Sequence, residues 1–146
     1  MEEKFAALIR PLFTTHPVRL FGLLLLCAPY LYSGFEKLIN FSAGIDEMSS
    51  YGLLPSPPYA AVTILVQLGG SLMVISGFWR WLGALLLAGF TIAATLIADP
   101  FWHAFAVERV RMLNTFFEHL GLSGGFLLIA WYNLHKFKHG DNVDWD

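Results

Sequence analysis

Long stretches without a charged residue alternate with short polar segments along this chain. The clearest stretch runs for 21 residues from Tyr59 to Trp79 and contains one strongly polar side chain, Gln67. A helix rises about 1.5 Å per residue, so about 20 apolar residues cross the hydrocarbon core of a bilayer. The pattern predicts four membrane-spanning helices, at about residues 18–39, 59–79, 81–103 and 115–134.

The segments between these spans are short and carry turn-forming residues. Residues 40–58 contain two acidic side chains and a proline-rich end, which predicts a short interfacial helix followed by a turn. Arg80 alone separates the second and third spans, so these two helices must form an antiparallel hairpin. Pro100 is expected to end the third helix or bend its last turn. The fold expected is therefore all-α: a four-helix transmembrane bundle with a short interfacial helix between spans one and two, forming one integral membrane domain over residues 1–146.

Basic residues indicate how the bundle is oriented. Lys and Arg are enriched in the segments that flank membrane helices on the cytoplasmic side. With four spans, both termini and the turn near Arg80 share one side of the membrane, and that side holds six of the nine basic residues. They are Lys4, Arg10, Arg19, Arg80, Lys136 and Lys138. The N and C termini are therefore predicted to be cytoplasmic, the latter as a polar tail from His135 to Asp146.

Composition agrees with a membrane protein and excludes several function classes. Hydrophobic residues make up 56% of the 146 residues and charged residues only 14%, well below the charged fraction of about a quarter in soluble domains. The net charge of -2 supplies no cationic field for nucleic acid. The single cysteine, Cys27, excludes an internal disulfide or dithiol relay and is expected to be a buried apolar thiol.

Ionisable and amide side chains near the membrane fall at one depth, in the outer leaflet. All four spans contribute to this polar layer, which consists of Glu36, Lys37, Gln67, Asp99, His103, Glu118 and His119. An isolated charge in lipid costs at least about 2.5 kcal/mol, so such groups pair, face the bundle interior or reach water. Lys37 is expected to pair with Glu36 or Glu118.

The polar layer has three interpretations. Its members lock the helix ends together and reach the headgroups, or they line a ligand pocket between the helices, for which a quinone head group is the candidate. A metal or haem site is disfavoured, because His103 and His119 occur in no spacing typical of metal ligands. No catalytic triad and no flavin or nicotinamide signature is present, so the sequence leaves open whether the chain is an enzyme.

Several short motifs resemble one family of small bacterial membrane proteins. Ser-Gly-Phe-Glu-Lys-Leu at 33–38 closes span one, and Gln-Leu-Gly-Gly at 67–70 lies in span two. Phe-Glu-His-Leu at 117–120 and Leu-Ser-Gly-Gly-Phe at 122–126 lie in span four. In order and spacing, over residues 18–134, these motifs resemble the four-span DoxX family.

The resemblance implies a function at the membrane. Members of this family are associated with membrane oxidoreductase assemblies, including the membrane subunit of an archaeal thiosulfate:quinone oxidoreductase. It implies an inner-membrane subunit or anchor of an oxidoreductase that works with the quinone pool. The expected partners are the lipid bilayer, an oxidoreductase subunit and further copies of this chain. The alternative is a non-catalytic scaffold or a small-molecule carrier.

The chain also departs from the family pattern at the polar positions. Relatives often carry an acid at the position of Gln67, and a Lys-Asn pair at the position of Glu118 and His119. Lys37 is kept, so a pair between Lys37 and Glu118 could replace an acid-lysine pair of the relatives. Because of these departures, thiosulfate chemistry is not assigned to this chain.

Overall fold

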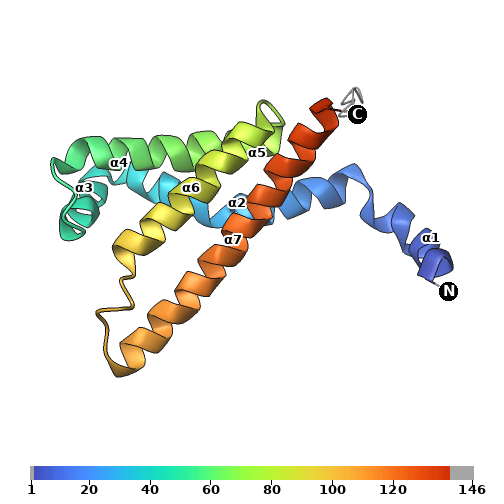
Figure 1. The fold of residues 1–146 in the computed structure, drawn as a ribbon. Coiled ribbons are helices and arrows are strands. Elements are labelled where there is room, and N and C mark those ends of the chain that lie inside the picture. Colours follow the sequence, from blue (N-terminus) through green and yellow to red (C-terminus); the bar gives the residue numbers. More distant parts are fainter. Residues whose placement is uncertain (1, 139–146) are drawn as a thin grey trace.

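Residues 2–138 are described by a computed structural model, in which they form helices joined by short loops (Figure 1). The helices are α1 (Glu2–Phe13), α2 (His16–Ile39), α3 (Phe41–Ser50), α4 (Ser56–Ile64), the π-helical turn η1 (Leu65–Gly69), α5 (Gly70–Ser76), α6 (Arg80–Ala98) and α7 (Ala106–Lys138). No strand occurs in residues 2–138, and the all-α prediction is confirmed.

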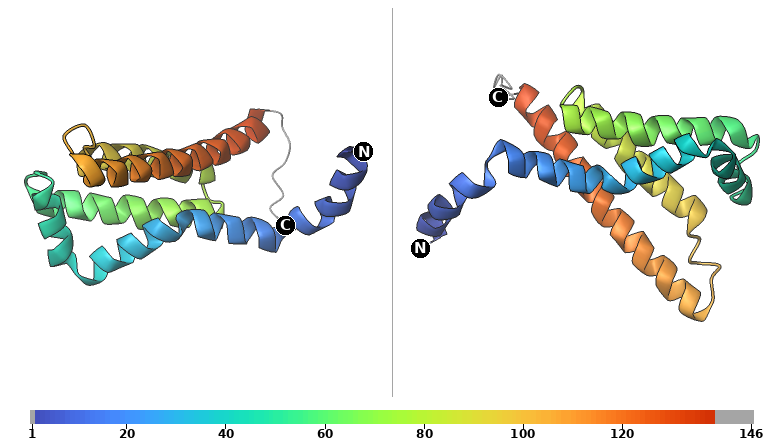
Figure 2. Two further views of the ribbon diagram at one scale, coloured as in Figure 1. Left: turned by 90° about the horizontal axis from the view of Figure 1, so that it is seen from below. Right: turned by 180° about the vertical axis from the view of Figure 1, so that it is seen from behind.

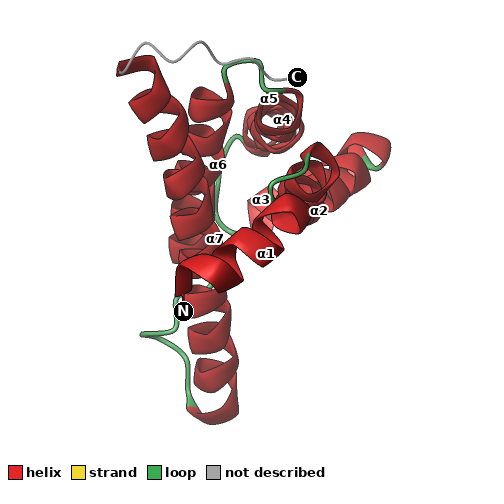
Figure 3. Cartoon of the chain, turned by 90° about the vertical axis from the view of Figure 1, so that its right-hand side faces the viewer, coloured by secondary structure: helices red, strands yellow, loops and turns green. Residues whose placement is uncertain are grey.

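The helices form two layers. Helices α6 and α7 lie side by side and antiparallel in one layer, and α2 lies with the continuous α4–η1–α5 helix in the other (Figures 2 and 3). Helix α3 turns back after α2 and packs against both α2 and α4 at one end of the molecule. Helix α1 extends away from the body of the protein. The core between the layers is built around Cys27, Tyr30, Leu87 and Phe126.

Three helices are long and apolar enough to cross a membrane: α2, the helix over Ser56–Ser76, and α6. The fourth predicted span, residues 115–134, lies within α7. Helix α7 is not among the three, because polar residues at both ends of its apolar stretch, such as Glu118 and Asn133, lower its mean hydropathy. Large apolar side chains are exposed along the helices, for example Leu65 at 71% and Phe21 at 63%. Lipid is the solvent in which such surfaces are favourable.

Two helices end earlier than the sequence predicts. The second span was predicted to reach residue 79, but the helix ends at Ser76 because Gly77 adopts a left-handed conformation with φ of 89°. The third was predicted to reach residue 103, but α6 ends at Ala98. Pro100 follows two residues later and cannot donate a backbone hydrogen bond, so residues 99–105 form the connection.

Helix α7 is longer than the predicted span at both ends. Its first turns carry Glu108 and Arg111, which form a salt bridge of 2.5 Å on the helix surface. This hydrogen bond lowers the pKa of Glu108 below its ordinary value, and an anionic side chain favours the N-terminal turn of a helix. At the other end α7 includes residues 135–138 of the predicted polar tail. The rest of that tail, 139–146, lies outside the described residues.

Candidate functional site

A cavity of about 420 Å³ opens between the two layers, at the end where α3 lies. Residues of α2, α3, α4, η1, α6 and α7 line it, and most of its wall is apolar. The polar lining residues are Tyr30, Ser33, Lys37, Glu47, Tyr51, Tyr59, Thr63, Gln67, Thr91 and His119. Its volume and composition are those of a small-molecule site, in which a few polar groups orient a largely apolar ligand.

Lys37 forms the charged end of this cavity. Its Nζ atom lies 2.8 Å from Oε2 of Glu47 on α3 and donates to Oγ of Ser33 at 2.9 Å. The side chain of Lys37 is only 11% exposed, against 38% for Glu47. Ser33 lies one helical turn before Lys37 on α2, so both side chains face the same way.

The expected pairing of Lys37 with Glu36 or Glu118 is wrong. Neighbours on a helix diverge by about 100°, and Glu36 is exposed on a different side of α2. Glu118 is also exposed. Glu47 takes their place because α3 folds back against α2 and brings its acidic side chain over the end of that helix. Asn40 supports this reversal by capping α3, where its Oδ1 accepts a hydrogen bond from the backbone N–H of Ala43.

Gln67 is the most deeply buried polar group at the charged end of the cavity. Its side chain is 6% exposed, and Nε2 donates to Oγ of Ser33 at 3.2 Å. Its Oε1 atom is buried and has no hydrogen-bond partner among the residues the structure describes. An unsatisfied buried acceptor costs about 1–3 kcal/mol. Gln67 also lies in the π-helical turn η1, a distortion often found at functional sites.

A chain of hydrogen bonds runs along the opposite wall, from α2 through α6 to α7. The hydroxyl oxygens of Tyr30 and Thr91 are 2.5 Å apart. Thr91 donates to the carbonyl of Leu87 at 2.6 Å, and Thr95 donates to the carbonyl of Thr91 at the same distance. Oγ1 of Thr95 is also 2.6 Å from Nδ1 of His119. These contacts hold Tyr30 and His119 in place at the cavity wall.

Tyr51 stands at the mouth of the cavity, just after α3. Partial burial raises the pKa of its phenol above the ordinary value, and the nearby carboxylates of Glu47 and Asp99 raise it further. The phenol therefore stays protonated and neutral throughout the physiological range.

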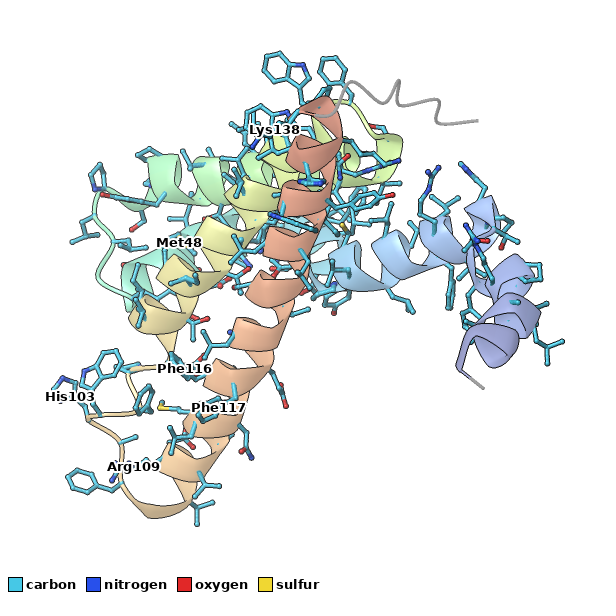
Figure 4. The ribbon with its side chains drawn as sticks, turned by 45° about the vertical axis from the view of Figure 1, so that its right-hand side comes forward. Met48, His103, Arg109, Phe116, Phe117 and Lys138 are labelled. Carbon is cyan, nitrogen blue, oxygen red and sulfur yellow. The ribbon has the colours of Figure 1, made fainter. Side chains whose placement is uncertain are left out.

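The cavity brings together three of the seven predicted site residues, Lys37, Gln67 and His119. The other four, Glu36, Asp99, His103 and Glu118, do not line it. His103 lies on the connection between α6 and α7, which projects away from Met48 in the cavity wall (Figure 4). Within residues 2–138 no group of three or more His, Cys, Asp or Glu side chains could hold a metal ion.

Sequence reasoning missed the other seven polar residues of the lining: Tyr30, Ser33, Glu47, Tyr51, Tyr59, Thr63 and Thr91. Ser33 had a usable signal, because it precedes Lys37 by four residues and so shares its helix face. Glu47 had none, since only the direction in which α3 folds decides what its carboxylate meets. Thr91 and Thr95 are four apart and could have been recognised as one polar stripe on an apolar helix.

The fold and the cavity define a class: an all-helical integral membrane protein whose helices enclose a mainly apolar cavity with a polar end. The DoxX family model matches residues 18–100, and the chain belongs to the DoxX family. The resemblance drawn from the motifs is confirmed.

Two proteins of Escherichia coli K12 are similar to this chain. Inner membrane protein YphA is 24% identical over 102 residues, which cover 69% of this chain and 72% of YphA. Inner membrane protein YqjF is 30% identical over 105 residues, with the same coverage of 69% and 72%. No solved structure matches the chain. These inner-membrane relatives and the apolar helices together support a membrane protein of the bacterial inner membrane.

Proposed function

We propose that the cavity binds a small lipophilic molecule with a polar head group, and that a quinone-type ring is that molecule. The observation that carries the proposal is the buried, unpartnered Oε1 of Gln67 at the cavity wall. A purely structural glutamine satisfies its amide within the fold, because an orphaned acceptor destabilises the protein. A ligand that completes the hydrogen bonding offsets this cost.

The rest of the cavity suits the same kind of ligand. Aromatic and aliphatic side chains such as Phe90, Ile97 and Leu122 form most of the wall. Lys37 and Glu47 lie together at one end, where they give a head group a fixed electrostatic orientation. Apolar rings with a few polar substituents partition into the bilayer, so such a ligand would reach the cavity from the surrounding lipid.

We also propose a four-span topology in which α7 is the fourth membrane helix. Helix α7 packs antiparallel along α6. Helix α6 is apolar enough to cross the membrane, so a helix that packs along it is expected to lie in lipid as well. In this arrangement α3 is the interfacial helix, both termini are cytoplasmic and the cavity opens toward the outer leaflet.

At the level of the cell, we propose a membrane subunit or anchor of an oxidoreductase. This step rests on the association of DoxX relatives with such assemblies, and the redox centre would belong to the partner subunit. The quinone-type ring bound in the cavity then connects that partner to the membrane pool. Self-association of this chain is a further arrangement compatible with the proposal.

Purification in mild detergent followed by mass spectrometry of bound lipids tests the binding proposal. We expect a quinone to co-purify with the wild-type protein and to be reduced several-fold by Gln67→Leu and by Lys37→Ala. Glu36→Ala is the matched control, since Glu36 is exposed next to Lys37 on the same helix but outside the cavity. Equal amounts of quinone in all four proteins, or none in any, would contradict the proposal.

One feature favours the scaffold alternative. Several polar contacts around the cavity join two different helices, among them Lys37 with Glu47, Tyr30 with Thr91, and Thr95 with His119. A scaffold would need these contacts only for stability, so Lys37→Ala would lower the melting temperature and no ligand would be found. A small-molecule carrier would instead move its ligand across vesicles that contain the purified chain.

A further inference from the structure

We infer that the cavity selects a ligand that donates hydrogen bonds, so the hydroxyl-bearing, reduced form of a ring binds more tightly than its carbonyl-bearing, oxidised form. This inference rests on the proposed function and specifies the chemistry that the same site recognises. It follows from where each proton goes in the polar wall of the cavity.

The hydrogen bonds along α6 favour one position for the protons of the Tyr30 and His119 side chains. A threonine hydroxyl has one proton. The Thr91 hydroxyl donates a hydrogen bond to the carbonyl of Leu87, so its oxygen accepts one from the phenol of Tyr30. The Thr95 hydroxyl donates a hydrogen bond to the carbonyl of Thr91, so its oxygen accepts one from Nδ1–H of His119.

These assignments turn two cavity residues into acceptors. With its single proton on Nδ1, the imidazole of His119 keeps a lone pair on Nε2. The phenol of Tyr30 donates its only hydrogen bond to Thr91, so toward a ligand it offers only the lone pairs of its oxygen. To reverse either role, Thr91 or Thr95 would have to give up its hydrogen bond to the carbonyl one turn earlier, at a cost of about 0.5–1.5 kcal/mol.

Gln67 adds the third acceptor and the one with the greatest consequence. Its Nε2 is occupied by Ser33, and its buried Oε1 has no partner in the described part of the chain. A carbonyl oxygen from a ligand would face this lone pair and leave it unsatisfied. A ligand hydroxyl would donate to it directly.

Donors in the cavity do not reverse this preference, because the hydroxyls of Ser33, Tyr59 and Thr63 can donate to a ligand hydroxyl as well as to a ligand carbonyl. Lys37 has already directed two of its three protons to Ser33 and Glu47. Tyr51 at the mouth is exposed, and its phenol can donate or accept, so it does not discriminate. A ligand hydroxyl can still accept a bond from Lys37 while donating to Gln67, whereas a carbonyl can only accept.

Three matched probes test this inference on the purified full-length protein. They are a decyl-substituted benzoquinone, the corresponding hydroquinone kept reduced without oxygen, and the dimethyl ether of that hydroquinone, which has the same ring but no donor. Binding is measured by quenching of tryptophan fluorescence or by calorimetry. We expect the hydroquinone to bind about tenfold more tightly than either other probe, which corresponds to about 1.4 kcal/mol.

Two variants separate recognition from folding, because the readout is the ratio of two affinities on the same protein. Gln67→Met removes the orphaned acceptor at similar volume, and we expect the ratio to fall to near one. Thr95→Val changes a residue outside the cavity lining and releases His119 to either tautomer, so the ratio should fall below that of the wild type. Glu36→Gln is the control and should keep the wild-type ratio.

The possible results separate the inference from the function on which it rests. Quinone binding that equals or exceeds hydroquinone binding in the wild type would overturn the inference and leave the proposed function standing. An unchanged ratio in Gln67→Met would also overturn it. Failure of all three probes to bind would overturn both.

Discussion

At the scale of single residues, Lys37 illustrates how a membrane protein accommodates a charge. The ammonium group lies near the end of α2, nearly buried, and is neutralised by Glu47 from the next helix and solvated by Ser33. Removing one member of such a pair leaves the other charge without compensation, which is usually more damaging than the pair is stabilising. The pair therefore matters most as a constraint on how α3 docks.

Glu47→Gln should lower the thermal stability of the protein. The substitution keeps the volume of the side chain but leaves the ammonium of Lys37 beside a neutral amide. Because Glu47 is 38% exposed and water screens part of the charge, we expect a loss of about 1 kcal/mol in the free energy of unfolding. Thermal unfolding in detergent measures it. Asp46→Asn changes the exposed neighbouring acid and should have no effect, and equal losses in both variants would contradict the prediction.

At the scale of helices, close packing between α5 and α6 depends on two glycines. A Cβ atom added to Gly83 would lie 2.7 Å from Cβ of Met73 and 2.8 Å from the carbonyl oxygen of Gly70. Between membrane helices, such close approach replaces the hydrophobic effect as the source of association.

The tight turn that precedes α6 requires Gly77 at positive φ, and Arg80 Nε donates a hydrogen bond to the carbonyl of Val74 at 2.6 Å.

Gly83→Ala should destabilise the bundle, whereas Gly89→Ala on the same helix should not. Position 89 has no atom within 4 Å of an added Cβ, so alanine there only improves helix propensity. At position 83 the backbone of α5 must move, at a cost of about 1–3 kcal/mol. Melting temperatures of the two variants in the same detergent provide the comparison. A similar stability for both variants would show that α5 and α6 do not pack this closely.

At the scale of the whole molecule, the two-layer arrangement puts the last turns of α7 and the cavity at opposite ends. The turn after α5 and the end of α7 lie at one end, and α3 with the cavity lies at the other (Figure 1). In the proposed topology this separation places the ligand site in the outer leaflet and leaves the termini in the cytoplasm. Whether the ligand site lies in the outer leaflet and both termini in the cytoplasm depends on the number of spans.

Single cysteines can decide between three spans and four. Cys27 is 0% exposed, so Cys27→Ser gives a cysteine-free background with little change at the surface. Into it we would introduce Phe78→Cys, Arg109→Cys and Phe137→Cys, which replace exposed residues. With four spans, a membrane-impermeant maleimide should label only position 109 on intact cells. Labelling of position 137 together with 109 would mean that α7 does not cross the membrane.

Much of the fold is encoded locally and could be predicted from the chain alone. Uncharged stretches and turn residues indicate the helices, the membrane environment and the hairpin around Arg80, because helix formation and lipid insertion depend on near neighbours. The motifs in spans one, two and four, taken together, were sufficient to recognise the DoxX family. The helix ends were less predictable, since a left-handed Gly77 and the effect of Pro100 act over one or two residues.

The composition of the site follows from contacts between distant segments. Lys37, Gln67 and His119 could be picked out as polar residues in apolar helices, but no local pattern says which of them share a cavity. Partners such as Glu47 and Thr91 are brought in by the reversal after Asn40 and by the approach of α6 to α2 at Tyr30. The sequence by itself thus determines which polar side chains the helices carry, whereas the packing of whole helices decides which of these side chains meet.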